Sequence, residues 1–164
     1  LPDCVILVNN TYVMYYSVAD SGSWGIAIGM ATSPDGIRWT KYNNATTGSP
    51  YAESDPVLKP GKVYDTLVVW HAHVRKTATG WEMFYSGMAQ YSAYGSCSAI
   101  RNSYATSPDG IRWTKFEGNP VTTWNSGDPT FFVKDSIYFL YFGFYHCGGQ
   151  EIDVATGVRP PFAP

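Results

Sequence analysis

The chain has 164 residues, a length that favours one ordinary domain over two separate cores. Aromatic residues make up 16% of it and charged residues only 15%, which excludes a disordered chain or a coiled coil and favours aromatic-rich strands. The net charge of -2 comes without a run of Lys or Arg, so we expect no nucleic-acid or membrane partner and a neutral, polar ligand instead.

Metal-ligating residues are sparse and poorly spaced. The cysteines show no C-x-x-C pattern, and the few histidines do not complete a zinc set. These residues are Cys4, Cys97, Cys147, His71, His73 and His146. We therefore expect no metal and no cofactor.

An internal repeat organises the chain. The segment Ala31–Lys41 recurs without a change at Ala105–Lys115, and a decayed copy of its start appears at Ala155–Gly157. Each copy follows a stretch of alternating polarity, which predicts that each ends a strand of one repeated unit.

Each unit is predicted to begin with three strands. An apolar first strand is expected at Val5–Val8, Leu67–Trp70 and Phe131–Val133. An aromatic-rich second strand is expected at Tyr12–Ser17, Trp81–Ser86 and Tyr138–Gly143. An alternating third strand is expected at Ile26–Met30, Ser98–Asn102 and Glu151–Val154.

A tight turn follows the third strand in the first two units. Ser33–Gly36 and Ser107–Gly110 both read Ser-Pro-Asp-Gly, in which Pro starts the turn and Gly accepts the left-handed conformation after it. The turns predict fourth strands at Ile37–Tyr42 and Ile111–Phe116. The third unit shows no fourth strand.

Units of four antiparallel strands and roughly 60 residues, without helical periodicity, predict an all-β fold made of β-propeller blades. A β-sandwich is the alternative, although sandwiches rarely keep an unchanged internal repeat. The expected blades cover residues 1–58, 59–121 and, incompletely, 122–164 of a single part-propeller domain. Propellers need about four to eight blades. Two explanations stay open: a longer chain, or a homo-oligomer that completes the ring.

A family resemblance enters at the third unit. Ser126–Phe132, followed by Tyr138–Tyr141, resembles the aspartate-proline strand of the five-bladed propeller glycoside hydrolases of the arabinanase/xylosidase and invertase/levanase-like kind. The blade segment Ile28–Trp39 is similar to theirs as well. The resemblance covers essentially residues 1–157 and implies hydrolysis of glycosidic bonds in a plant or microbial glycan.

The resemblance also implies roles for three aspartates. In that family an acidic residue opens the innermost strand of successive blades and points into an axial funnel, and Asp3, Asp65 and Asp128 match those positions. Asp3 would then be the catalytic base or nucleophile. Asp128 or Asp65 would bind the sugar and tune the pKa of the general acid. Without the resemblance, an Asp before a strand is expected to cap a turn or bind backbone amides.

The sequence departs from this pattern in the general acid, which in the family is normally a glutamate. No glutamate heads a first strand: they lie at Glu53, Glu82, Glu117 and Glu151. Whether the chain is an enzyme therefore stays open. The alternatives are a noncatalytic glycan-binding propeller, and a structural half-propeller that assembles with another chain.

Further candidates concern the sugar and the compartment. Sugar contacts are expected from Trp70, His71, His73, Trp24 and Trp124, which lie at strand ends or outside the repeat. The repeated Trp39 and Trp113 are instead expected to pack between sheets. A disulfide between Cys97 and Cys147 would suit an extracellular or periplasmic protein, and the cytoplasm is the alternative.

Overall fold

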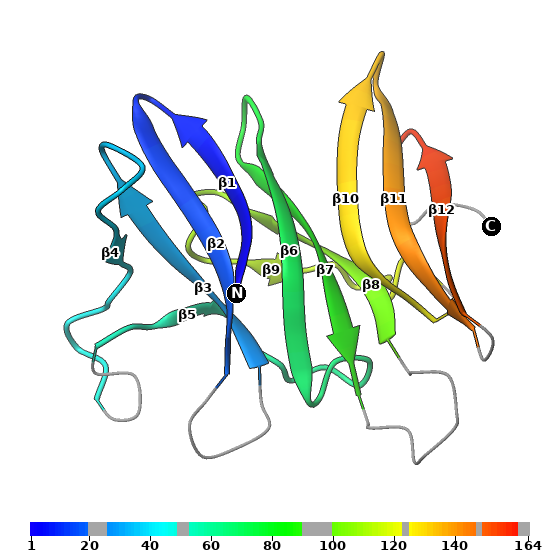
Figure 1. Ribbon diagram of the computed structural model, residues 1–164, viewed down its shortest axis with the longest axis horizontal. Coiled ribbons are helices and arrows are strands. Elements are labelled where there is room, and N and C mark those ends of the chain that lie inside the picture. Colours follow the sequence, from blue (N-terminus) through cyan, green and yellow to red (C-terminus); the bar gives the residue numbers. More distant parts are fainter. Residues whose placement is uncertain (20–25, 49–52, 90–99, 123–124, 147–148, 161–164) are drawn as a thin grey trace.

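The computed structural model describes residues 1–19, 26–48, 53–89, 100–122, 125–146 and 149–160. Within these ranges the chain consists of β-strands and the turns between them, without a helix, and therefore without a helical segment that could cross a membrane. Three groups of strands stand side by side (Figure 1). The fold is all-β, as the composition and the repeat predict.

We call each group, whose strands are antiparallel, a blade; a parallel pairing of Ile26 with Val68 joins the first two groups into one nine-stranded sheet, and the third group is a separate three-stranded sheet. Blade 1 contains β1 (Pro2–Val8), β2 (Thr11–Ala19), β3 (Ile26–Ser33), β4 (Thr40–Lys41) and β5 (Pro56–Leu58). Blade 2 contains β6 (Val68–Lys76), β7 (Trp81–Met88), β8 (Ile100–Ser107) and β9 (Thr114–Lys115). Blade 3 contains β10 (Ser126–Lys134), β11 (Ile137–His146) and β12 (Gly149–Gly157). The predicted first, second and third strands lie within these elements to within one residue, except that Ser98 and Ala99 lie outside the described residues.

The strand registers show which residues of the three blades are equivalent. Ala31 lies opposite Met14 in blade 1, and Ala105 lies opposite Met83 in blade 2. In blade 3 the alanine of the decayed copy, Ala155, takes the same place opposite Leu140. Equivalent residues of the three blades can therefore be named from the ladders.

The fourth strands are much shorter than the sequence predicts, since β4 and β9 contain two residues each. The preceding turn is the cause. The Asp35 carboxylate accepts the N–H groups of Ile37 and Arg38, so these amides are not available to a neighbouring strand. Asp109 does the same in blade 2. Part of the edge of β3 pairs instead with β5.

Buried side chains join the blades face to face. One cluster fills the space between blades 1 and 2, around the fully buried Tyr15, Met83 and Tyr85. A second cluster fills the space between blades 2 and 3, around Phe84 and Leu140. Trp113 packs edge-to-face on Tyr15 with ring centroids 5.9 Å apart, the packing role expected of the repeated tryptophan.

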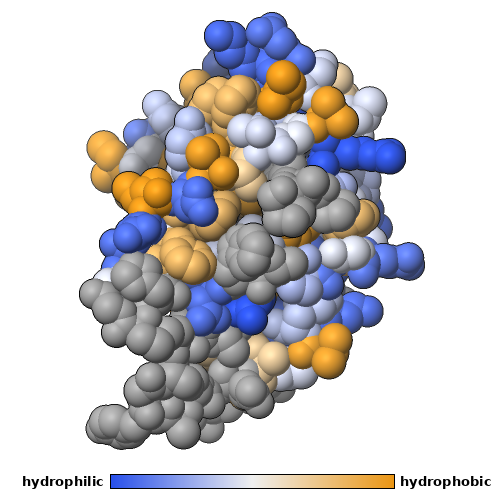
Figure 2. All heavy atoms as spheres, turned by 90° about the vertical axis from the view of Figure 1, so that its right-hand side faces the viewer, coloured by the Kyte–Doolittle hydropathy of each residue, from blue (hydrophilic) through white to orange (hydrophobic). Residues whose placement is uncertain are grey.

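The outward face of blade 3 has no blade packed on it among the described residues. Tyr141 occupies the ladder position that Phe84 holds in blade 2, but it is exposed, as are Phe132 and Val154 beside it. Apolar side chains are visible on this side of the molecule (Figure 2). We call this exposed apolar face, formed by Phe132, Tyr141 and Val154, the apolar end face of blade 3.

The two identical turns differ in surroundings, which gives a first prediction. Gly36 and Gly110 both have positive φ, at 76° and 82°. The atom nearest to a Cβ on Gly36 would be a ring carbon of Tyr12, at 3.6 Å, whereas a Cβ on Gly110 would lie 2.8 Å from the Tyr15 hydroxyl and 3.0 Å from the Trp81 ring. We expect Gly36→Ala to lower the free energy of unfolding by about 1–2 kcal/mol.

Gly110→Ala should cost about 1–3 kcal/mol more than Gly36→Ala, because it adds overpacking to the same backbone strain. Urea denaturation of both variants measures the difference directly. Equal losses would show that the buried surroundings of the second turn yield without cost.

Candidate functional site

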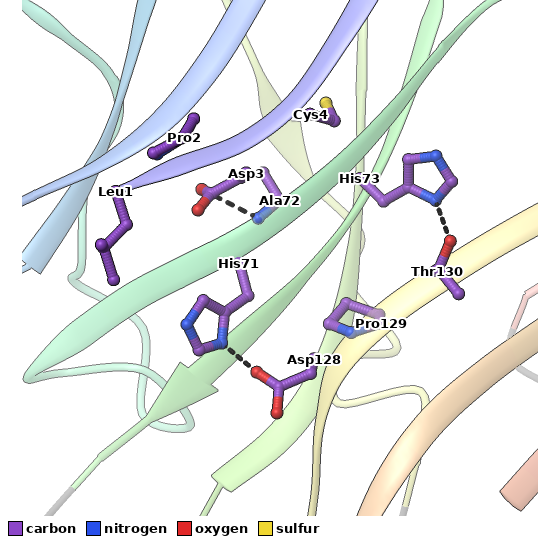
Figure 3. Close-up of a pocket in the computed structure, with 10 residues that line it drawn as sticks. All are labelled: Leu1, Pro2, Asp3, Cys4, His71, Ala72, His73, Asp128, Pro129 and Thr130. Carbon is purple, nitrogen blue, oxygen red and sulfur yellow. Dashed lines mark hydrogen bonds and ion pairs between the residues drawn. The ribbon is translucent and has the colours of Figure 1, made fainter. Parts of the chain in front are cut away.

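The first strands of the three blades converge on one cavity of about 620 Å³ (Figure 3). β1, β6 and β10 each carry a β-bulge at this level, where two residues stand opposite one residue of the second strand. The lining residues are Leu1, Pro2, Asp3, Cys4, His71, Ala72, His73, Asp128, Pro129 and Thr130. The cavity thus combines two carboxylates and two imidazoles from three blades.

Asp3 is held by partners from two blades. The Ser17 hydroxyl lies 2.9 and 2.8 Å from its two carboxylate oxygens, and the Ala72 N–H donates to Oδ2 at 3.1 Å. Burial raises the pKa of the Asp3 carboxyl above 3.8, while these hydrogen bonds and the nearby His71 oppose the rise. A carboxylate that is both fixed and partly desolvated is suited to accept a proton. Ser17 carries no signal in the sequence other than its place at the end of the second strand.

His71 and Asp128 form the second polar group of the cavity. The Nδ1 of His71 pairs with Oδ1 of Asp128, and the two side chains are 40% and 42% exposed, so both groups are accessible from the cavity. Both residues adopt left-handed backbone conformations, with φ of 49° and 53°. The pair joins blade 2 to blade 3 in the lining of the cavity.

Asp65 lies elsewhere, which corrects its expected place beside Asp3 and Asp128. It is 0% exposed, precedes β6 by three residues, and does not line the cavity. Its Oδ2 accepts hydrogen bonds from Lys115 Nζ at 2.6 Å and from the Tyr85 hydroxyl at 3.1 Å. Its Oδ1 accepts the Lys62 N–H at 2.8 Å. Asp65 is a buried structural anchor, and His71 occupies the position in blade 2 that corresponds to Asp128.

His73 lines the cavity and also joins two blades. Its Nδ1 accepts the Phe131 N–H at 2.8 Å and lies 2.9 Å from the Thr130 hydroxyl. Burial lowers the pKa of His73 and so favours the neutral ring, in which Nδ1 accepts the Phe131 N–H and Nε2 carries the proton. His73 therefore has a structural hydrogen bond, and its contact with a sugar stays a prediction.

Of the three tryptophans expected to contact sugar, Trp70 alone lies in the described part of the chain. Trp70 contacts the His71 ring, with centroids 5.6 Å apart, but it does not line the cavity. Trp24 and Trp124 lie outside the described residues, as do Cys97 and Cys147. Cys4 is a free thiol whose burial raises its pKa to about 11, so it is not a nucleophile at neutral pH.

Two kinds of group are missing from the cavity in the described part of the chain. No glutamate lines it; Glu82, the most enclosed one, is bound instead by Arg75 and by the hydroxyls of Tyr104 and Tyr138 at the junction of blades 2 and 3. The described residues also contain no cluster of three potential metal ligands. The cavity therefore holds a candidate base but no carboxylic acid of the expected kind.

Comparison with known sequences gives no match: neither a family model nor a curated protein corresponds to this chain. Solved structures do match. A family 117 glycoside hydrolase of the marine bacterium Zobellia galactanivorans is 22% identical, with a TM-score of 0.65 over 98% of this chain and 53% of its own. The family 32 β-fructofuranosidase of Bombyx mori is 16% identical, with a TM-score of 0.71 over 96% of this chain and 32% of its own.

A third solved structure, a β-1,2-mannobiose phosphorylase from Listeria innocua, is 14% identical, with a TM-score of 0.65 over 94% of this chain and 54% of its own. The chain thus spans about half, or less, of the proteins it resembles. At these identities the likeness concerns the fold. The chain is built of β-propeller blades of the kind found in glycoside hydrolases and phosphorylases.

Proposed function

We propose that the chain is part of a five-bladed propeller glycoside hydrolase that cleaves glycosidic bonds of a plant or microbial glycan. The observation that carries the proposal is the convergence of Asp3, His71 and Asp128, from the first strands of three blades, on one cavity. Structural neighbours with this fold act on glycosidic bonds, according to their names. The cavity also suits the neutral, polar ligand expected from the composition.

Asp3 is assigned the role of base or nucleophile. Its carboxylate is fixed by Ser17 and Ala72, so it can be aimed at a water molecule or at the sugar carbon. Asp128 is assigned the binding of sugar hydroxyls, because its carboxylate is accessible and is oriented by His71. The general acid would come from a blade beyond those described here.

The activity is tested on the protein with its full set of blades, by release of nitrophenol from nitrophenyl arabinosides and xylosides, and of free sugar from fructans and β-1,2-mannobiose. Turnover that depends on Asp3 supports the proposal. Saturable binding without turnover would favour the second candidate, a glycan-binding propeller in which the same carboxylates bind sugar hydroxyls. The observation in favour of that candidate is the absence of a glutamate from the cavity lining in the described ranges.

The apolar end face of blade 3 gives a prediction about assembly. We propose that further blades cover Phe132 and Tyr141, either from a longer chain or from another copy. The 18.1 kDa chain on its own is expected to self-associate, because exposed apolar faces attract each other. Light scattering measures its mass in solution.

The variant Phe132→Lys should reduce this self-association, since Phe132 is 47% exposed on the apolar end face of blade 3. Ile37→Lys is the matched control, because Ile37 is an exposed apolar residue of a turn. A monodisperse 18.1 kDa species for the unaltered chain would contradict the prediction.

A further inference from the structure

Two serines hold equivalent places in blades 1 and 2. Ser86 lies opposite Trp70, just before the bulge of β6. Ser17 lies opposite Leu1, just before the bulge of β1, and the two exchange backbone hydrogen bonds. We call Ser17 and Ser86 the clamp serines.

Each clamp serine reaches across to the next blade. Ser17 Oγ accepts the N–H of His71 at 3.1 Å, and Ser86 Oγ accepts the N–H of Asp128 at 3.0 Å. His71 and Asp128 are the first residues of the bulges in blades 2 and 3. The same hydrogen bond therefore occurs at both junctions between blades.

A bulge creates the need for such an acceptor. Two residues opposite one cannot both pair within the ladder, so an N–H group is left without a partner strand. A non-glycine residue in the left-handed region also costs about 1–2 kcal/mol and persists only where its surroundings hold it. A hydroxyl from the preceding blade satisfies the amide and fixes this conformation of His71 and Asp128.

The second residue of each bulge fits the same scheme. In blade 2 it is Ala72, whose N–H is accepted by Asp3 of blade 1. In blade 3 it is Pro129, which has no N–H. The preceding blade, blade 2, carries the apolar Ala72 at the ladder position that corresponds to Asp3 in blade 1. Every backbone N–H of the bulges in blades 2 and 3 thus has an acceptor in the preceding blade.

We propose that Ser17 and Ser86 are positioning residues that aim His71 and Asp128 into the cavity from the neighbouring blade. This assignment of a role in sugar recognition rests on the function proposed above, whereas the clamp itself does not. Because His71 and Asp128 pair with each other, the two serines fix the two ends of one contact. Loss of either serine is expected to loosen that contact without removing a group that touches the sugar.

Amide hydrogen exchange by NMR tests the clamp without any substrate. In Ser86→Ala we expect the Asp128 amide to exchange about tenfold faster, the ratio that corresponds to one lost hydrogen bond. The matched control is Ser103→Ala, since Ser103 is a buried serine of the same blade whose hydroxyl has no hydrogen-bond partner within the described ranges. It should leave the Asp128 amide unchanged.

Ser17 provides the second variant in case Ser86→Ala does not fold, because Ser17 is only partly buried. Ser17→Ala should accelerate exchange of the His71 amide about tenfold, and Ser17→Thr, which keeps the hydroxyl, should restore it. Equal exchange rates in the alanine variants and the Ser103→Ala control would overturn the clamp.

The same variants separate the clamp from the proposed function. If the chain cleaves or binds a glycan, Ser86→Ala should weaken kcat/KM or the affinity about tenfold, and Ser103→Ala should not. Faster exchange together with unchanged glycan kinetics would overturn the positioning role and leave the clamp. Faster exchange in a protein that neither binds nor cleaves glycans would overturn the proposed function, and with it the role in sugar recognition.

Discussion

Asp3→Asn is expected to lower glycan hydrolysis by about 10²–10⁴-fold, the contribution typical of a positioned base, without lowering the stability of the protein at neutral pH. Asn keeps a side-chain oxygen that can accept the Ala72 N–H, but it cannot take up a proton. This combination distinguishes a catalytic carboxylate from the structural alternative, in which Asp3 merely binds backbone amides.

The pH dependence of stability follows from the raised pKa of Asp3. A carboxyl whose pKa is higher in the folded state stabilises the protein below its unfolded value, near 3.8, and this contribution is lost as the pH rises through the folded value. Asp3→Asn should therefore gain stability relative to the unaltered protein across that window.

Urea denaturation at pH 4 and pH 7, together with the glycan assay, measures both effects of Asp3→Asn. A loss of several kcal/mol at pH 7 would show that Asp3 serves the fold rather than the reaction. Full retention of hydrolysis would exclude it as the base.

Asp65→Asn should have the opposite profile and lower the free energy of unfolding by about 3–5 kcal/mol, the usual cost of removing one partner from a buried ion pair. Lys115 would lose its carboxylate partner while only 9% of its side chain is exposed. Burial already lowers the pKa of Lys115, and Asp65 opposes that shift. Urea denaturation gives the loss.

The double variant Asp65→Asn/Lys115→Met is the control, because it also removes the Lys115 ammonium group that Asp65→Asn leaves without its carboxylate partner. It should lose less stability than Asp65→Asn alone, since the two residues are in contact and their effects are not additive. A loss in the double variant as large as that of Asp65→Asn would mean that the unpaired charge of Lys115 is not what destabilises Asp65→Asn. Neither variant changes a residue that lines the cavity.

Sequence reasoning found the strands because their signals are local. Aromatic alternation marks β2, β7 and β11, and the Ser-Pro-Asp-Gly turns end β3 and β8. The fourth strands are shorter than alternation predicts, because alternation does not reveal that the turn aspartate accepts hydrogen bonds from the N–H groups of Ile37 and Arg38.

The candidate site was only partly predictable, and Asp65 shows why. Its near-equal spacing from Asp3 and Asp128 suggested equivalence, but the loop before each first strand has its own length, so equal spacing does not give equal register. Counting back from Phe84–Ser86, the counterpart of Tyr141–Gly143, aligns His71 with Asp128. The bulge itself leaves no signal in the polarity pattern, because it adds a residue without changing composition.

The proline of the third bulge has a consequence for how such a chain can evolve. Pro129 has no amide N–H to donate. Blade 2, which precedes it, can therefore carry Ala72 at the position where blade 1 carries Asp3. Conversely, Ala72 offers an amide that the preceding blade must meet with an oxygen. Neighbouring blades thus form donor and acceptor pairs in which substitution of one position relaxes or restores selection on the other. Covariation at this level of the axis should therefore run between successive blades rather than within them.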